Sequence, residues 1–518
     1  MSSILSSNTK RVALNTLYMY IRMIIVLVIS LYMSRVVLDK LGTSDYGVYS
    51  SVTSVVTMLM FLNGTLSAGT SRFITFELGT DNQYKLKETF TTAFFSHLIL
   101  AVCIVIIMEA IGPWFLNNKL IIAEDRLQAA NFVFHLSVIN TFFSIIQIPY
   151  TATIIAHEDM NVYAYISILD AFLKLMVAIL MSKISHDRLI SYSVMMTVEQ
   201  IFIASLYCLY ASRKYIEARL SFCFNKLVFK NLIGFTSWNL LANMSETIRR
   251  EGSTVVLNMF FQPVIVAAQA IASQVAAQTM QLYNNFKTAL DPQIVKLYAS
   301  GEQDKSRQLV LRTTVYVFDM CLLIGLPLYL LMEPVLHLWL VEVPEYAVIF
   351  AKLLIIQNVI NSIQNMFYSS LIASAKLKTN SIAGFILVTI SFIVLYFLFK
   401  SGKSVLWVQY IYIIIACLQS FLVRPLILYR EVGYNLDDIY SVIYTCVKVT
   451  ICSLLLSVPF AFIVPKTVIG YLMILVESLL SVLIASYVYL DYDAKLVFKS
   501  YFHKIKIVII HNLTHKER

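Results

Sequence analysis

Fourteen apolar runs of about 19 to 34 residues follow one another along the chain, with short polar segments between them. A helix needs about 20 apolar residues to cross a hydrocarbon core of about 30 Å, so each run is long enough for one span. The runs are uninterrupted and lack the alternation of a transmembrane β-barrel. The pattern therefore predicts an all-α integral membrane protein with about 14 transmembrane helices, over 13–34, 46–64, 89–111, 131–156, 161–182, 189–211, 228–248, 253–286, 309–332, 346–372, 380–399, 404–429, 442–464 and 467–490.

Composition agrees with this class. The 518 residues are 59% hydrophobic and 14% charged, and their mean hydropathy of +0.75 is too high for a soluble globular protein. The excess of Lys and Arg over Asp and Glu, 40 against 30, fits basic cytoplasmic loops better than nucleic-acid binding, so the expected partner is the bilayer. No loop exceeds about 25 residues, which leaves no room for a soluble domain.

The distribution of basic residues predicts the orientation. With the N-terminus in the cytoplasm, the inner segments hold 25 Lys and Arg and the outer loops hold 11. Basic residues concentrate on the cytoplasmic side of membrane proteins. We therefore expect a multi-pass protein with both termini cytoplasmic and a basic cytoplasmic tail at 491–518.

A repeat at an offset of about 220 residues divides the chain. VVLDKLGTSDYGVYSSV at 36–52 is echoed by VVLNMFFQPVIVAAQAI at 255–271, and SRFITFELG at 71–79 by PQIVKLYASG at 292–301. Duplicated helix sets are common in transporters. The repeat predicts two pseudo-symmetric six-helix lobes with binding between them; the segments are an N-lobe at 1–211, a cytoplasmic connector at 212–227, a C-lobe at 228–430 and extra spans at 431–490.

One charge interrupts the first apolar run. Arg22 lies near the middle of 13–34, where a charged side chain costs about 2.5 to 3.5 kcal/mol on insertion scales. Asn15, Tyr18 and Arg22 share a helix face because they are three and four residues apart. The arginine either snorkels or pairs within the bundle, or it lines a water-filled cavity that receives an anion; the polar stripe favours the cavity.

Four further spans carry polar stripes, which a helix surrounded by lipid avoids. Such side chains either tie helices together or line a hydrophilic cavity, and four stripes spread over both lobes favour the cavity. Amides suit sugar hydroxyls and arginine suits phosphate. The stripes are Asn140, Ser144, Gln147 and Thr151; Asn239, Asn243, Glu246 and Arg250, with Arg249 and Glu251 beside them; Gln274, Gln278, Gln281 and Asn285; and Gln357, Asn361 and Gln364.

The other charges within the spans are less informative. Asp170 and Lys174 are four residues apart, which predicts a structural ion pair. The sequence also lacks HExxH, GxSxG, CxxC and a phosphate-binding glycine loop, so we expect neither catalytic residues nor a metal or cofactor. Candidate proton or cation sites without a sequence-local partner are Glu199, Asp319, Lys352, Lys448 and Glu477.

Seven stretches together resemble the bacterial O-antigen and capsule type of polysaccharide flippase, in the multidrug/oligosaccharidyl-lipid/polysaccharide exporter (MOP, MATE-like) superfamily. They cover the first twelve spans fairly evenly. The stretches are NTLYMYIRM at 15–23, LYMSRVVLDKLGTSDYGVYSSV at 31–52, SRFITFELG at 71–79, GFTSWNLL at 234–241, LNMFF at 257–261, DPQIVKLYASGE at 291–302 and LWLVEVPEY at 338–346.

The resemblance implies two lobes in a V around a central cavity, with extra helices as in the lipid II flippase branch. It implies translocation of undecaprenyl-diphosphate-linked oligosaccharide from the cytoplasmic to the periplasmic leaflet of the bacterial inner membrane, with other polysaccharide assembly proteins as partners. Arg22 matches the family's arginine in span 1, and Arg249 and Arg250 its basic pair in span 7. The polar stripes and these matched arginines together give the candidate binding residues, which are Asn15, Tyr18, Arg22, Asn239, Asn243, Glu246, Arg249, Arg250, Gln278 and Asn361.

One stretch departs from the family pattern. Where relatives read FFGPxxNAARGIA, this chain reads FFQPVIVAAQAIA, so Gln269 stands in place of an arginine. If that arginine contacts diphosphate in relatives, one such contact is lost here. The carried glycan and the coupling ion, whether proton or sodium, stay open.

Two other functions are compatible with the sequence. A cation-coupled drug exporter of the same superfamily is the first, although such exporters rely on buried carboxylates and the first two spans contain none. A polytopic glycosyltransferase or polysaccharide polymerase is the second, although the outer loops are short for a catalytic site.

Overall fold

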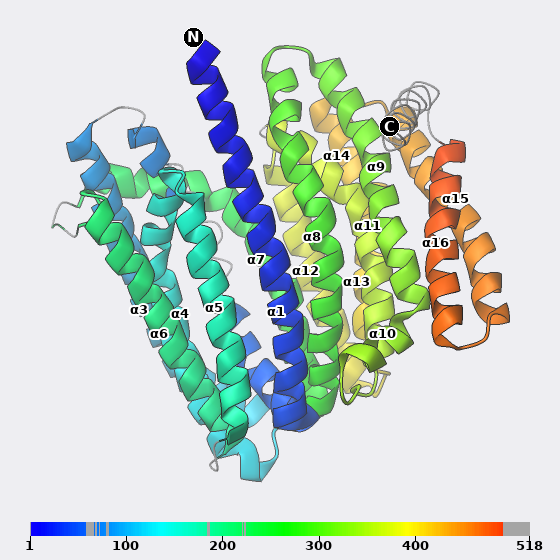
Figure 1. Cartoon of the computed structure of the whole chain (residues 1–518), viewed down its shortest axis with the longest axis horizontal. Coiled ribbons are helices and arrows are strands. Elements are labelled where there is room, and N and C mark those ends of the chain that lie inside the picture. Colours follow the sequence, from blue (N-terminus) through cyan, green and yellow to red (C-terminus); the bar gives the residue numbers. More distant parts are fainter. Residues whose placement is uncertain are drawn as a thin grey trace, which may run out of the picture. The chain divides into compact units, whose positions relative to one another are not determined.

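The computed structural model describes residues 2–58, 67, 70–71, 73–78, 82–183, 187–219, 221, 224–374 and 376–489. The predicted tail at 491–518 and the end of the second predicted span therefore lie outside the described residues. Within the described residues the regular structure is helical, which confirms the predicted all-α class (Figure 1).

Long helices account for the predicted spans. Eleven helices among the described residues are long and apolar enough to cross a membrane. The helices are α1 Ser2–Thr57, α3 Gln83–Lys119, α4 Leu127–Ala156, α5 Met160–Leu180, α6 Arg188–Lys214, α7 Lys226–Phe260, α8 Pro263–Ala299, α9 Gln303–Leu330, α10 Met332–Trp339, α11 Ala347–Ala373, α12 Lys378–Lys400, α13 Trp407–Leu418, α14 Arg424–Ile427, α15 Leu436–Ile463 and α16 Val468–Tyr489. With α1 counted as two spans that are separated at Gly42, α13 and α14 as one span, and the short α10 omitted, this order agrees with about 14 helices.

Helix α1 contains the first predicted span and the start of the second. They meet at Gly42, whose φ of 78° and ψ of 167° interrupt the helix. This backbone region is essentially restricted to glycine, because a Cβ atom clashes there. Gly42 therefore sets the point at which the chain leaves the first span.

The boundary between α7 and α8 differs from the prediction. The polar run Arg249–Glu251 suggested a loop at 249–252, but α7 continues through it to Phe260 and α8 begins at Pro263. Proline favours the first position of a helix, where its missing N–H is not needed. The break at Phe261 lies 219 residues after Gly42, close to the offset of the sequence repeat.

The chain forms two compact units. Unit 1 comprises Met1–Gln278, Leu336–Ala351 and Leu377–Ile415, and unit 2 comprises Thr279–Val335, Lys352–Lys376 and Ala416–Arg518. The predicted lobes at 1–211 and 228–430 stay a prediction.

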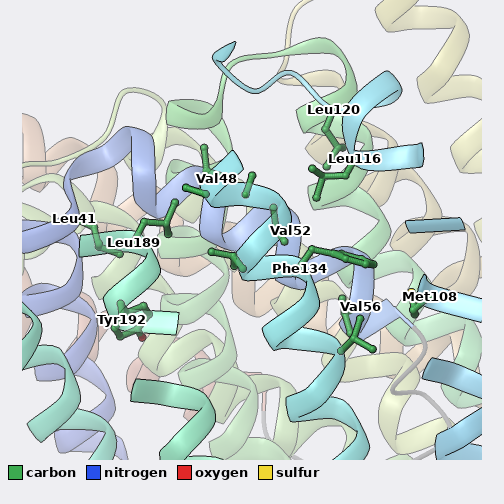
Figure 2. Close-up of a cluster of buried hydrophobic side chains, with 14 of the residues drawn as sticks. Leu41, Val48, Val52, Val56, Met108, Leu116, Leu120, Phe134, Leu189 and Tyr192 are labelled. Carbon is green, nitrogen blue, oxygen red and sulfur yellow. The ribbon is translucent and has the colours of Figure 1, made fainter. Parts of the chain in front are cut away.

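Unit 1 has a core in which the part of α1 after Gly42 packs against α3, α4 and α6 (Figure 2). Val48, Val52 and Val56 follow one another at four-residue spacing and are at most 1% exposed. Gly112 on α3 faces Phe134 on α4 so closely that a Cβ atom would lie 2.0 Å from the ring. Because lipid is as apolar as these side chains, close packing rather than hydrophobic burial holds such helices together.

In unit 2, helices α9, α15 and α16 lie side by side (Figure 1). The hairpin of α15 and α16 corresponds to the two extra spans predicted after the repeat. Ser457 on α15 and Ser481 on α16 are buried and lie 2.6 Å apart, so a hydrogen bond between their hydroxyls ties the hairpin together.

Candidate functional site

Arg22 is packed against α5 in unit 1. One of its Nη atoms donates to Ser167 Oγ at 3.4 Å, and its guanidinium carbon lies 4.9 Å above the centroid of the Tyr163 ring. The Ser167 hydroxyl in turn donates to the carbonyl oxygen of Tyr163 at 2.8 Å and lies 3.5 Å from the Tyr207 hydroxyl on α6. We call Arg22, Tyr163, Ser167 and Tyr207 the Arg22 cluster.

The Arg22 guanidinium is incompletely satisfied. Its Nε atom is buried without a hydrogen-bond partner, and among the described residues no carboxylate lies within ion-pair distance of it. A guanidinium has five N–H donors arranged for bidentate binding of phosphate or carboxylate. The cluster thus offers a positive charge with unused donors next to an aromatic ring.

Arg22 lies in the middle of the helical segment from Ser2 to Gly42, not at an end of it. The helix continues beyond the apolar run to Gly42, which places Arg22 about 30 Å from that end at a rise of 1.5 Å per residue. Its partners Tyr163 and Ser167 belong to the first two turns of α5. Arg22 therefore lies toward the end of unit 1 where α5 begins, and its predicted depth in the membrane stays a prediction.

Three further charges lie on the neighbouring turns of α5 and α6. Lys174 Nζ and Asp170 Oδ1 are 2.7 Å apart, which confirms the predicted ion pair. Glu199 on α6, only 5% exposed, lies within electrostatic reach of both. Arg22, Lys174, Asp170 and Glu199 together carry two positive and two negative charges when all are ionised.

The basic pair of α7 is ion-paired rather than free. Arg249 binds Glu246 on its own helix, with Nε 3.1 Å from Oε2, and lies 5.7 Å from the centroid of the Tyr412 ring. Arg250 donates through Nε to Glu251 Oε1 at 2.9 Å. Both arginines lie ten or more residues before the end of α7, whereas the predicted span 228–248 ended directly before them.

Two of the predicted amides, Gln274 and Gln147, connect helices, as does Asn358, which neighbours the stripe on α11. Gln274 on α8 donates to the carbonyl oxygen of Ser30 on α1 at 3.2 Å. Asn358 on α11 donates to Thr279 Oγ1 at 2.9 Å, and Gln200 on α6 to Gln147 Oε1 at 3.3 Å. For these side chains the interpretation as interhelical ties fits the geometry.

The remaining predicted residues are dispersed. Tyr18 packs edge-on against Tyr165, with ring centroids 6.1 Å apart, and Gln278 is half-buried on α8. Asn361 is buried on α11 and accepts a hydrogen bond from Gln364. The side chains of Asn15, Asn239 and Asn243 lie outside the described residues. That all ten residues line one cavity stays a prediction.

Gln269, the departure from the family pattern, is 4% exposed. Its Oε1 atom accepts from Gln409 Nε2 on α13 at 2.6 Å, and its Nε2 atom donates to Ser273 Oγ at 3.3 Å. The amide thus ties α8 to α13.

Sequence reasoning missed the partners of Arg22 on α5. Tyr163, Ser167, Asp170 and Lys174 follow one another at spacings of four, three and four, which places them on one helix face. That spacing indicates a polar face on α5 from the sequence alone. Which helix faces Arg22, however, depends on tertiary packing.

A second set of contacts joins α1 and the end of α3 to the turn between α7 and α8. The backbone N–H of Ile121 donates to the carbonyl oxygen of Asn258 at 3.1 Å. In return, Asn258 Nδ2 donates to the carbonyl oxygen of Ile121 at 3.4 Å. Gly47 approaches Pro263 so closely that a Cβ atom would lie 1.9 Å from the proline carbonyl oxygen. We call the contacts of Gly47 with Pro263 and of Ile121 with Asn258 the α1–α7 seam.

Arg126, directly before α4, links three segments of unit 1 through its ion pairs with Asp45 on α1 and Asp187 at the start of α6. Its Nε donates to Asp45 Oδ1 at 2.9 Å, and an Nη atom donates to Asp187 Oδ1 at 3.2 Å. Burial opposes the charge of Asp187, but hydrogen bonds from Arg126 and from the N–H groups of Ile190 and Leu189 hold the pKa of Asp187 below its ordinary value. The ion cluster therefore fixes the start of α6 against α1 and α4.

Replacing Arg126 with alanine should lower the free energy of unfolding by about 2 kcal/mol, because two carboxylates lose their charged donor. Because the pKa of Asp187 is lowered in the folded protein, its ionised carboxylate stabilises the fold at pH values above its ordinary pKa of 3.8. This stabilisation is lost as the pH falls below that value. The difference between wild type and variant should thus narrow below about pH 4, which unfolding at several pH values measures. Arg188→Ala, whose guanidinium binds one backbone carbonyl, is the control; equal losses in both variants would contradict the prediction.

Comparison with known proteins places this fold. Residues 19–209 match the MatE family model, and no curated protein matches the chain in sequence. A solved structure of the lipid II flippase MurJ in an inward closed conformation is similar, with a TM-score of 0.68 and 12% identity over 92% of this chain and 98% of that chain. A solved structure of an inward-facing multidrug resistance MATE family transporter of the MOP superfamily is also similar. Its TM-score is 0.66, with 14% identity over 80% of this chain and 96% of that chain.

A structure of MATE in complex with MaD3S has a TM-score of 0.58 and 15% identity over 82% of this chain and 96% of that chain. At such identities the likeness establishes a shared fold. The chain thus shares its fold with these transporters and flippases, and its residues 19–209 match the MatE family model.

Proposed function

We propose that this protein is a flippase that moves a polyprenyl-diphosphate-linked oligosaccharide, with undecaprenyl as the lipid, from the cytoplasmic to the periplasmic leaflet for surface polysaccharide synthesis. The observation that carries the proposal is Arg22: a half-buried guanidinium with a buried, unpartnered Nε and no carboxylate partner among the described residues. A positive charge buried within a membrane-spanning bundle is stabilised by pairing with an anion. A diphosphate supplies one with the geometry that a guanidinium binds best.

The position of Arg22 suits a lipid diphosphate. It lies toward the end of unit 1 where α5 begins, within two helical turns of the start of that helix. With the predicted orientation, this end faces the cytoplasm and lies close to the phosphate groups of the inner leaflet. A diphosphate arriving from that leaflet would meet Arg22 first, while its prenyl tail stays in lipid.

The sugar headgroup explains why such a protein is needed. Its hydroxyls lose their hydrogen bonds to water in hydrocarbon, at a cost of several kcal/mol each without replacement. A polar path through the helices replaces those bonds, and alternating access lets the path open to one side at a time. The tyrosine hydroxyls of the Arg22 cluster offer such replacements beside the diphosphate.

The extent of the fold match adds support. The match to the lipid II flippase MurJ leaves about 41 of the 518 residues outside, fewer than the 54 residues of Leu436–Tyr489. Part of the α15–α16 hairpin must therefore belong to the shared fold. The matches to MATE transporters cover 80% to 83% of this chain and do not require the hairpin.

A cation-coupled multidrug exporter is the second candidate. The half-buried pair Asp170 and Lys174 and the buried Glu199 favour it, because transport coupled to protons or sodium ions uses intramembrane carboxylates. The MatE family match is equally compatible with it. In that function Arg22 would repel a cationic drug rather than attract it.

The two functions separate in a deletion strain. For a flippase, loss of the protein leaves lipid-linked repeat units on the cytoplasmic face and removes surface polysaccharide, and the wild-type gene restores it. Drug susceptibility should be unchanged. Increased sensitivity to cationic drugs together with normal surface polysaccharide would instead support the exporter.

A further inference from the structure

We propose that a groove on unit 2, lined by α9, α11 and α15, is a binding site for an anionic phospholipid of the bilayer, whose phosphate contacts Lys352 and Lys466. The inference is independent of the transported substrate, because every residue involved belongs to unit 2 and none belongs to the Arg22 cluster.

The groove has the dimensions of lipid chains. Its volume is about 750 Å³, and its lining runs along α15 from Cys446 to Phe462. This stretch of 17 residues spans about 24 Å, most of a hydrocarbon core of about 30 Å. α9 and α11 form the floor, where Gly325 allows the helices to pack so closely that a Cβ atom would lie 3.2 Å from Ile355 and from Val359.

The groove opens on the surface of the helices. Ile451 and Leu454 line it and are 53% and 37% exposed, and Phe462 at its end is 87% exposed. An open apolar groove of this kind leaves hydrophobic side chains uncovered by protein. In a bilayer, hydrocarbon chains are therefore the occupants that match its walls.

Charges gather at one end of the groove. Lys352 near the start of α11, Lys466 in the turn between α15 and α16, and Glu333 at the start of α10 line it there. Lys352 Nζ lies 5.4 Å from the centroid of the Tyr329 ring. Among the described residues, neither lysine forms an ion pair with a carboxylate.

These charges select the headgroup. Two lysines against one glutamate leave a net positive charge at the end of an apolar groove, where α11 begins and α15 ends and where phosphate groups of a leaflet lie. Basic residues at this depth bind anionic lipids more tightly, by about fivefold for each lysine. Phosphatidylglycerol carries a net negative charge, whereas the zwitterionic phosphatidylcholine does not, so the groove should prefer the former.

The test uses the full-length protein, delipidated in mild detergent, with lipid binding counted by native mass spectrometry. Wild type should bind one phosphatidylglycerol at least about tenfold more tightly than phosphatidylcholine. Lys352→Met with Lys466→Met should weaken phosphatidylglycerol binding by about 25-fold and leave phosphatidylcholine binding unchanged. Lys352→Arg with Lys466→Arg should keep it, which separates loss of charge from misfolding.

Lys448→Met is the matched control. Lys448 is also an intramembrane lysine of α15, but its Nζ lies 4.1 Å from the centroid of the Tyr444 ring and it does not line the groove. This variant should bind phosphatidylglycerol as wild type does. Equal binding of the two phospholipids, or unchanged binding in the Lys352 and Lys466 double methionine variant, would overturn the site. Tighter binding of undecaprenyl phosphate than of phosphatidylglycerol would overturn the chosen occupant.

Discussion

Replacing Arg22 with alanine should lower translocation of a diphosphate-linked glycan by about 10- to 100-fold. Hydrogen bonds between charged groups contribute about 1.5 to 3 kcal/mol, and each 1.4 kcal/mol changes binding tenfold. The loss should appear as reduced surface polysaccharide in a deletion strain that expresses the variant at the wild-type level. Stability should change little, since the contacts of Arg22 with described side chains are one long hydrogen bond and one ring.

Two further variants sharpen this result. Arg22→Lys keeps the charge but loses the planar group above Tyr163, so it should retain part of the activity. Arg35→Ala removes an arginine of the same helix that lies outside the cluster, and it should behave as wild type. Full restoration of surface polysaccharide by Arg22→Ala would show that the guanidinium does not bind the substrate.

Gly47→Val should prevent the α1–α7 seam from closing. The added Cβ atom would lie 1.9 Å from the Pro263 carbonyl oxygen, and backbone atoms cannot move aside as a flexible side chain can. Overpacking of this kind costs about 1 to 3 kcal/mol, which is enough to shift an equilibrium between closed and open seams by about 5- to 100-fold. Transport that requires the seam to close and open in turn should fall accordingly.

Labelling reports the state of the seam directly. Ser54 lies two turns beyond Gly47 on α1 and donates to Glu251 on α7 at 3.1 Å. In a protein without its native cysteines, Ser54→Cys should react faster with a water-soluble maleimide when Gly47 is valine. Ser44→Val, at an exposed position of α1, is the control and should leave the rate unchanged. Equal rates for Gly47→Val and wild type would contradict the expected opening.

The hydrophobic pattern predicted the fold class and most helices because each apolar run must form its hydrogen bonds within itself in lipid. Helix ends were less predictable. The run Arg249–Glu251 looks like a loop, yet α7 continues through it because neighbouring glutamates neutralise both arginines. Polarity alone does not end a helix when the charges are paired.

The candidate site was predictable only in part. Arg22 is visible in the sequence as a charge in an apolar run, and the pair Asp170 and Lys174 by its four-residue spacing. The packing of α1 against α5, which brings Tyr163 and Ser167 to Arg22, depends on side-chain fit between helices distant in sequence. The same holds for amides such as Gln274, whose helical spacing suits a cavity lining and an interhelical tie equally well.

Translocation by purified protein tests the central proposal most directly. Full-length protein is reconstituted into vesicles loaded with an undecaprenyl-diphosphate-linked oligosaccharide, and an impermeant glycosidase measures the sugar exposed on the outer leaflet over time. We expect the exposed fraction to rise well beyond that of protein-free vesicles with wild type, and to stay near the protein-free level with Arg22→Ala. An exposed fraction equal to that of protein-free vesicles, from wild-type protein that expels a cationic drug in the same preparation, would contradict the flippase function.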